Sequence, residues 1–143
     1  MKPSAHVAVS AAAAATVYVL SDSLPMTLAC MASGVLIDLD HVFDYVREHR
    51  SHVNVRHFFA VFRATTFRRL VLPLHSWELM ATLWVLAFFA GWPPVLTGGL
   101  IGATLHLGLD QLFNRVTWRS YFLIWRIACR FHPERTFEVT TRR

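Results

Sequence analysis

Four apolar runs constrain what this chain can fold into. They cover residues 5–20, Met26–Tyr45, Ser76–Trp92 and Val95–Phe113. Each is close to the roughly 20 residues that a helix needs to cross a bilayer. A segment inside a bilayer must satisfy its own backbone hydrogen bonds, so runs of this kind form helices. The chain is also 16% charged, against about 25% for an ordinary soluble domain. We therefore predict an all-α integral membrane bundle of four membrane-embedded helices.

Two of these runs carry features of their own. Lys2 precedes the Ala-rich first run, as in a signal peptide, but no clear small-x-small cleavage site follows. We therefore predict an anchored helix there, with a signal peptide as the alternative. In the fourth run, Gly98 and Gly102 have the GxxxG spacing, which lets two helices approach closely.

Two basic segments complete the predicted fold. Val55–Leu72 reads as an amphipathic helix in the plane of the membrane interface, ended by Pro73. A second amphipathic helix is expected after Asn114, where arginines cover only about 60° of a helix surface. These arginines are Arg115, Arg119, Arg126 and Arg130. They form either a solvated face or a stripe that meets phosphate groups. The 143 residues are enough for one domain, residues 1–143.

The positive charges predict an orientation and a partner. All 14 Lys and Arg fall in residues 1–2, 47–69 and 115–143, and the turns 21–25 and 91–94 contain none. The positive-inside rule then places both termini on the cytoplasmic side of a bacterial inner membrane. Because the net charge of +5 lies beside apolar runs, we expect anionic membrane lipids as partners and no nucleic acid. The pattern does not indicate an oligomeric state.

Imidazoles and carboxylates gather at the predicted cytoplasmic end of every apolar run. Ionisable groups at such a depth are costly and usually mark a site. The alternative is that they are solvated helix ends or hydrogen-bonded packing residues. The candidate metal ligands are His6, Asp38, Asp40, His41, His75, Glu78, His106 and Asp110.

The spacing of these residues agrees with a shared site. His106 and Asp110 are four residues apart and share a helix face, and Asp38 and His41 are three apart. Asp40 joins the same site only if its helix ends near Leu39, and otherwise it would orient a histidine. One zinc ion takes three or four protein ligands. Eight candidates therefore suit two or three ions, or one ion with orienting partners. Zinc is our first expectation, with manganese or iron as alternatives.

Several of these motifs resemble a known family. The pieces are Asp38-Leu39-Asp40-His41, His75-Ser76 and His106-Leu107-Gly108-Leu109-Asp110. Their order resembles the YdjM-like, LexA-regulated, membrane-bound metal-dependent hydrolases, which are similar to zinc-dependent phospholipase C and the zinc nucleases. The resemblance implies an all-helical phosphoesterase with clustered zinc ions. The chain departs from the family pattern at Leu70–His75, which lacks the family's first His, its Arg and its Thr.

We therefore expect a membrane-bound metal-dependent hydrolase. Its substrate would be a phosphate ester of a lipid or another amphipathic molecule, with Asp40 or Glu78 as general base. One alternative is a non-enzymatic membrane protein that binds metal or haem through its histidines. Another is a structural membrane protein whose arginine-rich segments bind lipid or a partner. His49, His52 and His57 are expected at the surface, where one of them could bind a substrate phosphate.

Overall fold

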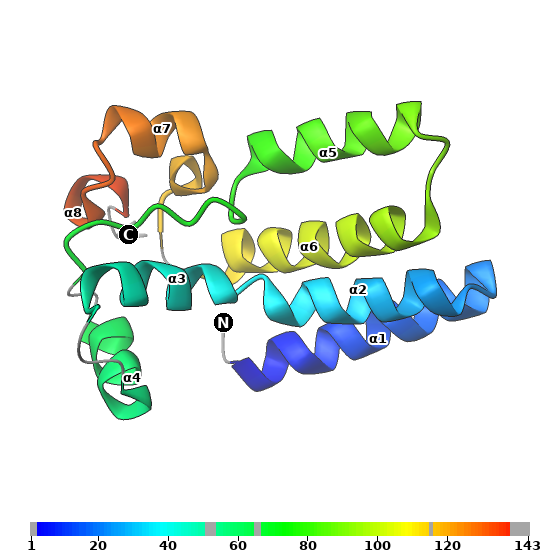
Figure 1. Ribbon diagram of the computed structural model, residues 1–143, viewed down its shortest axis with the longest axis horizontal. Coiled ribbons are helices and arrows are strands. Elements are labelled where there is room, and N and C mark those ends of the chain that lie inside the picture. The colour runs from blue at the N-terminus through cyan, green and yellow to red at the C-terminus, as the bar shows by residue number, and fades with distance from the viewer. Residues whose placement is uncertain (1–2, 51–53, 65–66, 115, 138–143) are drawn as a thin grey trace. The chain divides into compact units, whose positions relative to one another are not determined.

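The protein is all-helical in the residues that its structure, a computed structural model, describes (Figure 1). These are residues 3–50, 54–64, 67–114 and 116–137, and no β-strand occurs among them. The predicted all-α class is therefore confirmed. The contacts divide the chain into two compact units, residues 1–37 with 77–114, and residues 38–76 with 115–143. We name them the apolar unit and the basic unit, and describe each by itself. That the whole chain behaves as a single domain stays a prediction.

The apolar unit consists of four helices. They are α1 (Pro3–Ser21), α2 (Leu24–Leu36), α5 (Trp77–Phe89) and α6 (Pro94–Phe113). Short turns join α1 to α2 and α5 to α6, and Ser23 caps α2 by accepting a hydrogen bond from the Met26 N–H at 3.4 Å. In Figure 1, α2 lies between α1 and α6, and α5 packs against α6.

Two glycines bring α2 and α6 into close contact. A Cβ atom at Gly98 would clash with the carbonyl group of Met26, and one at Gly102 would clash with the carbonyl group of Cys30. No larger residue fits either position unless the two helices move apart. The predicted close approach at the GxxxG pair is therefore confirmed.

The second apolar run does not form one helix as predicted. Helix α2 ends at Leu36, and α3 (Leu39–Glu48) begins after a break at Ile37 and Asp38. Among the described residues, no single helix has both the length and the apolar character needed to cross a bilayer. Helices α2 and α3 meet that criterion only when they are counted together, by length and composition.

The basic unit contains α3, α4 (Val55–Ala64) and three short helices near the C-terminus. The short helices are η1 (Trp118–Tyr121), α7 (Leu123–Ala128) and α8 (Pro133–Thr136). Tyr45 from α3 and Val61 from α4 belong to the apolar core of this unit, with Phe67, Leu70 and Leu72. Large side chains from three parts of the sequence thus pack α3, α4 and the chain after α4 against one another.

Both predicted amphipathic helices are corrected by the structure. The helix expected over Val55–Leu72 stops at Ala64, and residues 67–72 are not helical. The helix expected after Asn114 is divided into η1 and α7, and Arg115 lies outside the described residues. In both regions the backbone bonds to side chains or to other segments, which helical periodicity alone does not anticipate.

Carboxylates on α3 explain why residues 68–75 are not helical. Asp40, Asp44 and Glu48 are each four residues apart and therefore share one face of α3. Glu48 accepts a hydrogen bond from the backbone N–H of Arg68 (3.0 and 3.1 Å to its two oxygens). Asp44 accepts from the N–H groups of Val71 (2.6 Å) and Leu72 (3.1 Å). Asp40 accepts from those of Leu74 (2.6 Å) and His75 (3.2 Å). These amides bond to side chains in place of helical carbonyls, so the segment lies against α3 without being helical.

Arg126 holds the carbonyl groups of the same segment. Its guanidinium group donates to the carbonyl oxygens of Val71 (2.8 Å), Leu72 (2.7 Å) and His75 (2.8 Å). The side chain is fully buried. It therefore neither faces water nor lies on an exposed phosphate-binding stripe, as the sequence analysis expected of the arginines after Asn114. Carboxylates on one side and a guanidinium on the other thus fix the backbone that leads to His75.

Candidate metal-binding groups

Three candidate ligands meet in the apolar unit. His6 comes from α1, and His106 and Asp110 come from successive turns of α6. All three are buried, with exposed fractions of 5%, 2% and 7%. The Nε2 atom of His6 lies 3.1 Å from Asp110 Oδ1, and the Nε2 atom of His106 lies 3.7 Å from Asp110 Oδ2. The two imidazole rings stack with centroids 4.1 Å apart. We call these three residues the helical group.

The spacing in the helical group fits metal ligands. Ligand bonds of about 2.0 Å in a tetrahedral site place neighbouring ligand atoms about 3.3 Å apart. The two nitrogen–oxygen distances, 3.1 and 3.7 Å, bracket that value. Two imidazoles and a carboxylate are also a ligand set of catalytic zinc sites, which keep a fourth position open. The residues present therefore fit a divalent ion.

A backbone carbonyl sets the tautomer of His106. The Nδ1 atom of this ring lies 2.8 Å from the carbonyl oxygen of Gly34 in α2. A carbonyl oxygen only accepts hydrogen bonds, so Nδ1 must carry a proton. In the neutral ring the lone pair is then on Nε2, the atom nearest to Asp110. Metal-binding histidines commonly have such a partner on their other nitrogen.

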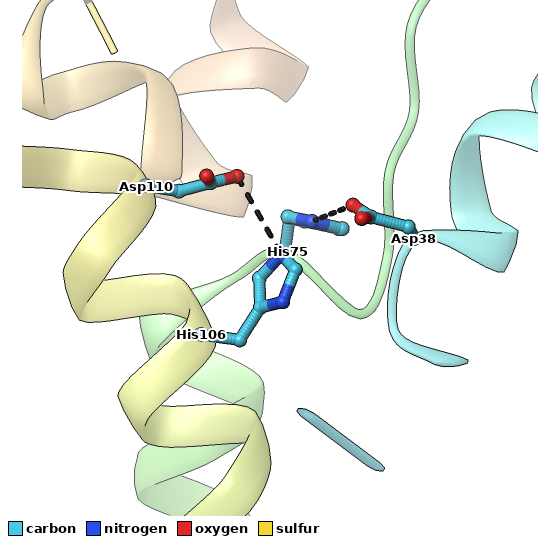
Figure 2. Close-up of side chains that lie close together, drawn as sticks. All are labelled: Asp38, His75, His106 and Asp110. Atoms are coloured by element: carbon cyan, nitrogen blue, oxygen red, sulfur yellow. Dashed lines mark ion pairs between the residues drawn. The ribbon is translucent and has the colours of Figure 1, made fainter. Parts of the chain in front are cut away.

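A second set of candidate ligands meets in the basic unit, near the start of α3. The Oδ1 atom of Asp38 lies 3.5 Å from the Nε2 atom of His75 and 3.9 Å from that of His41. His75 is buried, His41 is half-buried, and 43% of the Asp38 side chain is exposed. We call these three residues the loop group. Figure 2 shows one ion pair from each group, that of His75 with Asp38 and that of His106 with Asp110.

Asp40 lies behind His75 and orients it. The Oδ2 atom of Asp40 is 3.2 Å from the Nδ1 atom of His75 and also accepts the backbone N–H groups of His75 and Leu74. Helix α3 continues past Leu39, and this geometry is the one that the orienting role requires. It directs the Nε2 atom of His75 towards Asp38.

The environment of His75 favours its protonated form. Burial lowers the pKa of this imidazole, but hydrogen bonds and negative charge from Asp38 and Asp40 outweigh it, so the pKa lies above its usual value. An imidazole whose charged form is favoured by two carboxylates is in an electrostatic field that also favours a bound cation.

Sequence reasoning did not find the residues that hold the backbone before His75 in place. Asp44, Glu48 and Arg126 contact residues 68–75, which end at His75. The repeated four-residue spacing of Asp40, Asp44 and Glu48 was a visible signal of an acidic helix face. It does not reveal the partner, because the hydrogen bonds go to backbone groups that have no sequence signature.

The remaining predicted site residues that the structure describes belong to neither ligand group. Glu78 lies half-buried in the first turn of α5, and its role as a general base stays a prediction. In the basic unit, His49 directly follows the last residue of α3 and His57 lies on α4, and His52 is outside the described residues. Asp38, His75, His106 and Asp110 could all serve as ligands of a metal ion, but the kind of metal is not indicated.

Comparison of the chain with protein-family models, with curated proteins and with solved structures found no match. The resemblance to the YdjM-like hydrolases therefore stays a prediction that rests on the motifs alone.

Proposed function

We propose that this chain is a membrane-bound, metal-dependent hydrolase that acts on a phosphate ester of a lipid or another amphipathic substrate. The observation that carries the proposal is the pair of ligand groups. Each group has two imidazoles and one carboxylate, and the Nε2 atoms of the imidazoles lie 3.1–3.9 Å from an oxygen of that carboxylate. In each, one histidine has a hydrogen-bond acceptor at Nδ1, Gly34 in the helical group and Asp40 in the loop group. Packing alone does not require this arrangement twice.

Each group has a defined part in the proposed site. His6, His106 and Asp110 would hold one divalent ion, and Asp38, His41 and His75 would supply ligands of a second. Zinc is the first expectation, and manganese or iron are the alternatives. A bound divalent ion supplies Lewis acidity, which stabilises phosphoryl charge and lowers the pKa of a coordinated water. The ligand sets leave coordination positions for water and substrate.

Proton transfer is assigned to Glu78 or Asp40. Glu78 is half-buried at the start of α5 in the apolar unit. The Oδ2 atom of Asp40 already accepts three hydrogen bonds, which exceeds its two lone pairs. A proton would therefore have to go to Oδ1 if Asp40 acts as the base.

The surface of the apolar unit supports a place in the membrane. Its described residues include no Lys or Arg. Large apolar side chains are exposed on it, with Val19 and Leu20 each at 81% and Phe89 at 79%. A monomer in water rarely exposes such groups together. We propose that this unit is embedded in the bacterial inner membrane, with lipids as partners and the basic termini on the cytoplasmic side.

The test is hydrolysis by purified protein in detergent, loaded in turn with zinc, manganese and iron. Substrates are phosphatidic acid, p-nitrophenyl phosphate and bis(p-nitrophenyl) phosphate. We expect phosphate or nitrophenol release that falls by at least about 100-fold in His106→Ala and in His75→Ala. His132→Ala is the control, because His132 is exposed and belongs to neither group. A folded, metal-loaded protein that hydrolyses none of these substrates would refute the proposal, and a Soret absorption band would favour the haem-binding alternative.

A further inference from the structure

A second polar cluster surrounds Tyr45 in the basic unit. The hydroxyl group of this buried residue is 2.8 Å from the Nδ1 atom of His57 and 3.3 Å from the backbone nitrogen of Asn54. The ring of His49 stacks on Tyr45 with centroids 4.8 Å apart, and the rings of His49 and His57 meet edge to face at 4.9 Å. The cluster shares no residue with either ligand group.

The cluster lines an open pocket of about 600 Å³. Its walls are His49, Asn54, Arg56 and His57. The side chains of Arg56 and His57 are exposed and His49 is half-buried. A ligand in this pocket could therefore reach one guanidinium and two imidazoles at the same time.

The hydrogen bonds in the cluster turn donors towards the pocket. The N–H group of Asn54 donates to the Tyr45 oxygen, and the hydroxyl proton has its shorter contact to Nδ1 of His57. If Tyr45 donates there, the neutral ring of His57 carries its proton on Nε2, where it is a donor. Arg56 has only donors. The pocket thus offers hydrogen-bond donors and positive charge.

Among the described residues, no carboxylate lines this pocket. The acidic residues of α3 accept the amides of residues 68–75 and are engaged there. Helix α4 has no acidic residue in its first turn. The described lining therefore offers an anion complementary charge, and it offers a metal ion no negatively charged ligand.

We propose that this pocket binds a phosphate group, carried either by a lipid headgroup or by a soluble phosphate monoester. Arg56 pairs with the phosphate oxygens, and the Nε2–H of His57 adds a hydrogen bond. The neutral ring of His49 donates its Nδ1–H to the Tyr45 carbonyl oxygen at 3.3 Å, so this ring lies beside the ligand without donating to it. The apolar residues Val55 and Phe59 are exposed on the same helix, at 72% and 44%, as a helix beside a lipid surface requires. The inference goes beyond the proposed function, because it needs no metal and no catalysis.

The experiment follows the histidine ring signals of ¹⁵N-labelled full-length protein by NMR. Inorganic phosphate and glycerol 3-phosphate test the soluble source. Phosphatidylcholine bilayers with and without phosphatidic acid, into which the protein is reconstituted, test the lipid source by the same ring signals. We expect saturable shifts of the His49 and His57 signals either with the soluble phosphates or with phosphatidic acid in the bilayer, and the arm that responds identifies the source. Arg56→Ala should weaken the response at least about tenfold, since a charge-assisted hydrogen bond is lost.

Two control variants make the outcome decisive. Arg69→Ala removes an equal charge from an exposed position that does not line the pocket, and it should leave binding unchanged. His106→Ala changes the helical group and should also leave the His49 and His57 shifts intact, even if the hydrolase proposal fails. The inference is overturned if neither arm responds, if Arg56→Ala and Arg69→Ala behave alike, or if His106→Ala abolishes the shifts.

Discussion

The two units place the same kinds of side chain by different means. In the apolar unit, helix register alone brings His106 and Asp110 onto one face of α6, and close packing of helices brings His6 beside them. In the basic unit, His75 lies on a non-helical segment that side chains of α3 and α7 hold in place. All Lys and Arg of the described residues belong to the basic unit.

This contrast shows which kind of support a mutation should affect. The helical group depends on backbone-to-backbone contact between helices, so it should be sensitive to the size of the glycines. The loop group depends on charged side chains that hold backbone polar groups, so it should be sensitive to single charges. The predictions that follow probe one support at a time.

The largest effect is expected from Arg126→Met in the basic unit. The change removes this donor from the carbonyl oxygens of Val71, Leu72 and His75. The Leu72 oxygen keeps the N–H of His75, whereas each carbonyl left unsatisfied costs about 1–3 kcal/mol. We expect the free energy of unfolding to fall by more than about 3 kcal/mol. Denaturant unfolding followed by circular dichroism measures it. Arg119→Met is the control, since Arg119 is exposed and its guanidinium group lies over the rings of Trp118 and Trp125. Equal losses in the two variants would contradict the role of Arg126.

The next effect is expected from Gly102→Ala in the apolar unit. Its Cβ would clash with the Cys30 carbonyl group and the Ser33 hydroxyl group. Overpacking of this kind costs about 1–3 kcal/mol, and thermal unfolding in detergent measures it. Gly99→Ala and Gly108→Ala are matched controls, because nothing lies within 4 Å of a Cβ at either position. Both should be neutral or stabilising, since alanine favours helix. Equal destabilisation at all three glycines would mean that close helix contact is not the cause.

An intermediate effect on metal affinity is expected from Asp40→Asn. Asparagine keeps an oxygen that can accept the amides of Leu74 and His75 but removes the charge beside the His75 ring. Loss of such a partner weakens metal binding by about 10–100-fold. Titration with zinc against a competing chelator measures it, and Asp22→Asn in an exposed turn is the control. Unchanged affinity in Asp40→Asn would show that the loop group needs no orienting carboxylate.

The smallest effect is expected in the pH dependence of stability without metal. The pKa of His75 is raised in the folded protein, so its protonated ring stabilises the fold fully below the unfolded pKa of about 6.5. This contribution is lost as the pH rises through the folded pKa. Thermal unfolding in the presence of a chelator should therefore show a stability loss in that window that is smaller in Asp40→Asn. An identical pH profile in the variant would separate Asp40 from the titration of His75.

The sequence predicts the helical group better than the loop group. His106 and Asp110 are four residues apart on one helix, so the sequence alone predicts that they share a face. The GxxxG spacing of Gly98 and Gly102 predicts the close contact of α6 with α2. Residues 67–72 were expected to be helical because their apolar and basic residues have helical periodicity. Their amides bond instead to Asp44 and Glu48, and such side-chain contacts with a distant backbone leave no periodic signal.

Arg126 illustrates the same limit. On an ideal helix it shares a face with Arg119 and Arg130, yet the helix is interrupted between Tyr121 and Leu123, and Arg126 is buried while the other two are exposed. A one-dimensional pattern treats the three arginines as equivalent. Only the three-dimensional fold shows which arginine donates hydrogen bonds to backbone carbonyl groups.

The central claim, that the two groups bind metal, is tested most directly by elemental mass spectrometry of the detergent-purified protein. We predict two or three equivalents of zinc, manganese or iron, lost in the double variant Asp38→Ala/His106→Ala. The single variants refine the result. Each single variant shows how much of the metal depends on the group that it changes. Near-zero metal in a folded wild-type protein, or a metal content that both substitutions leave unchanged, would contradict the account.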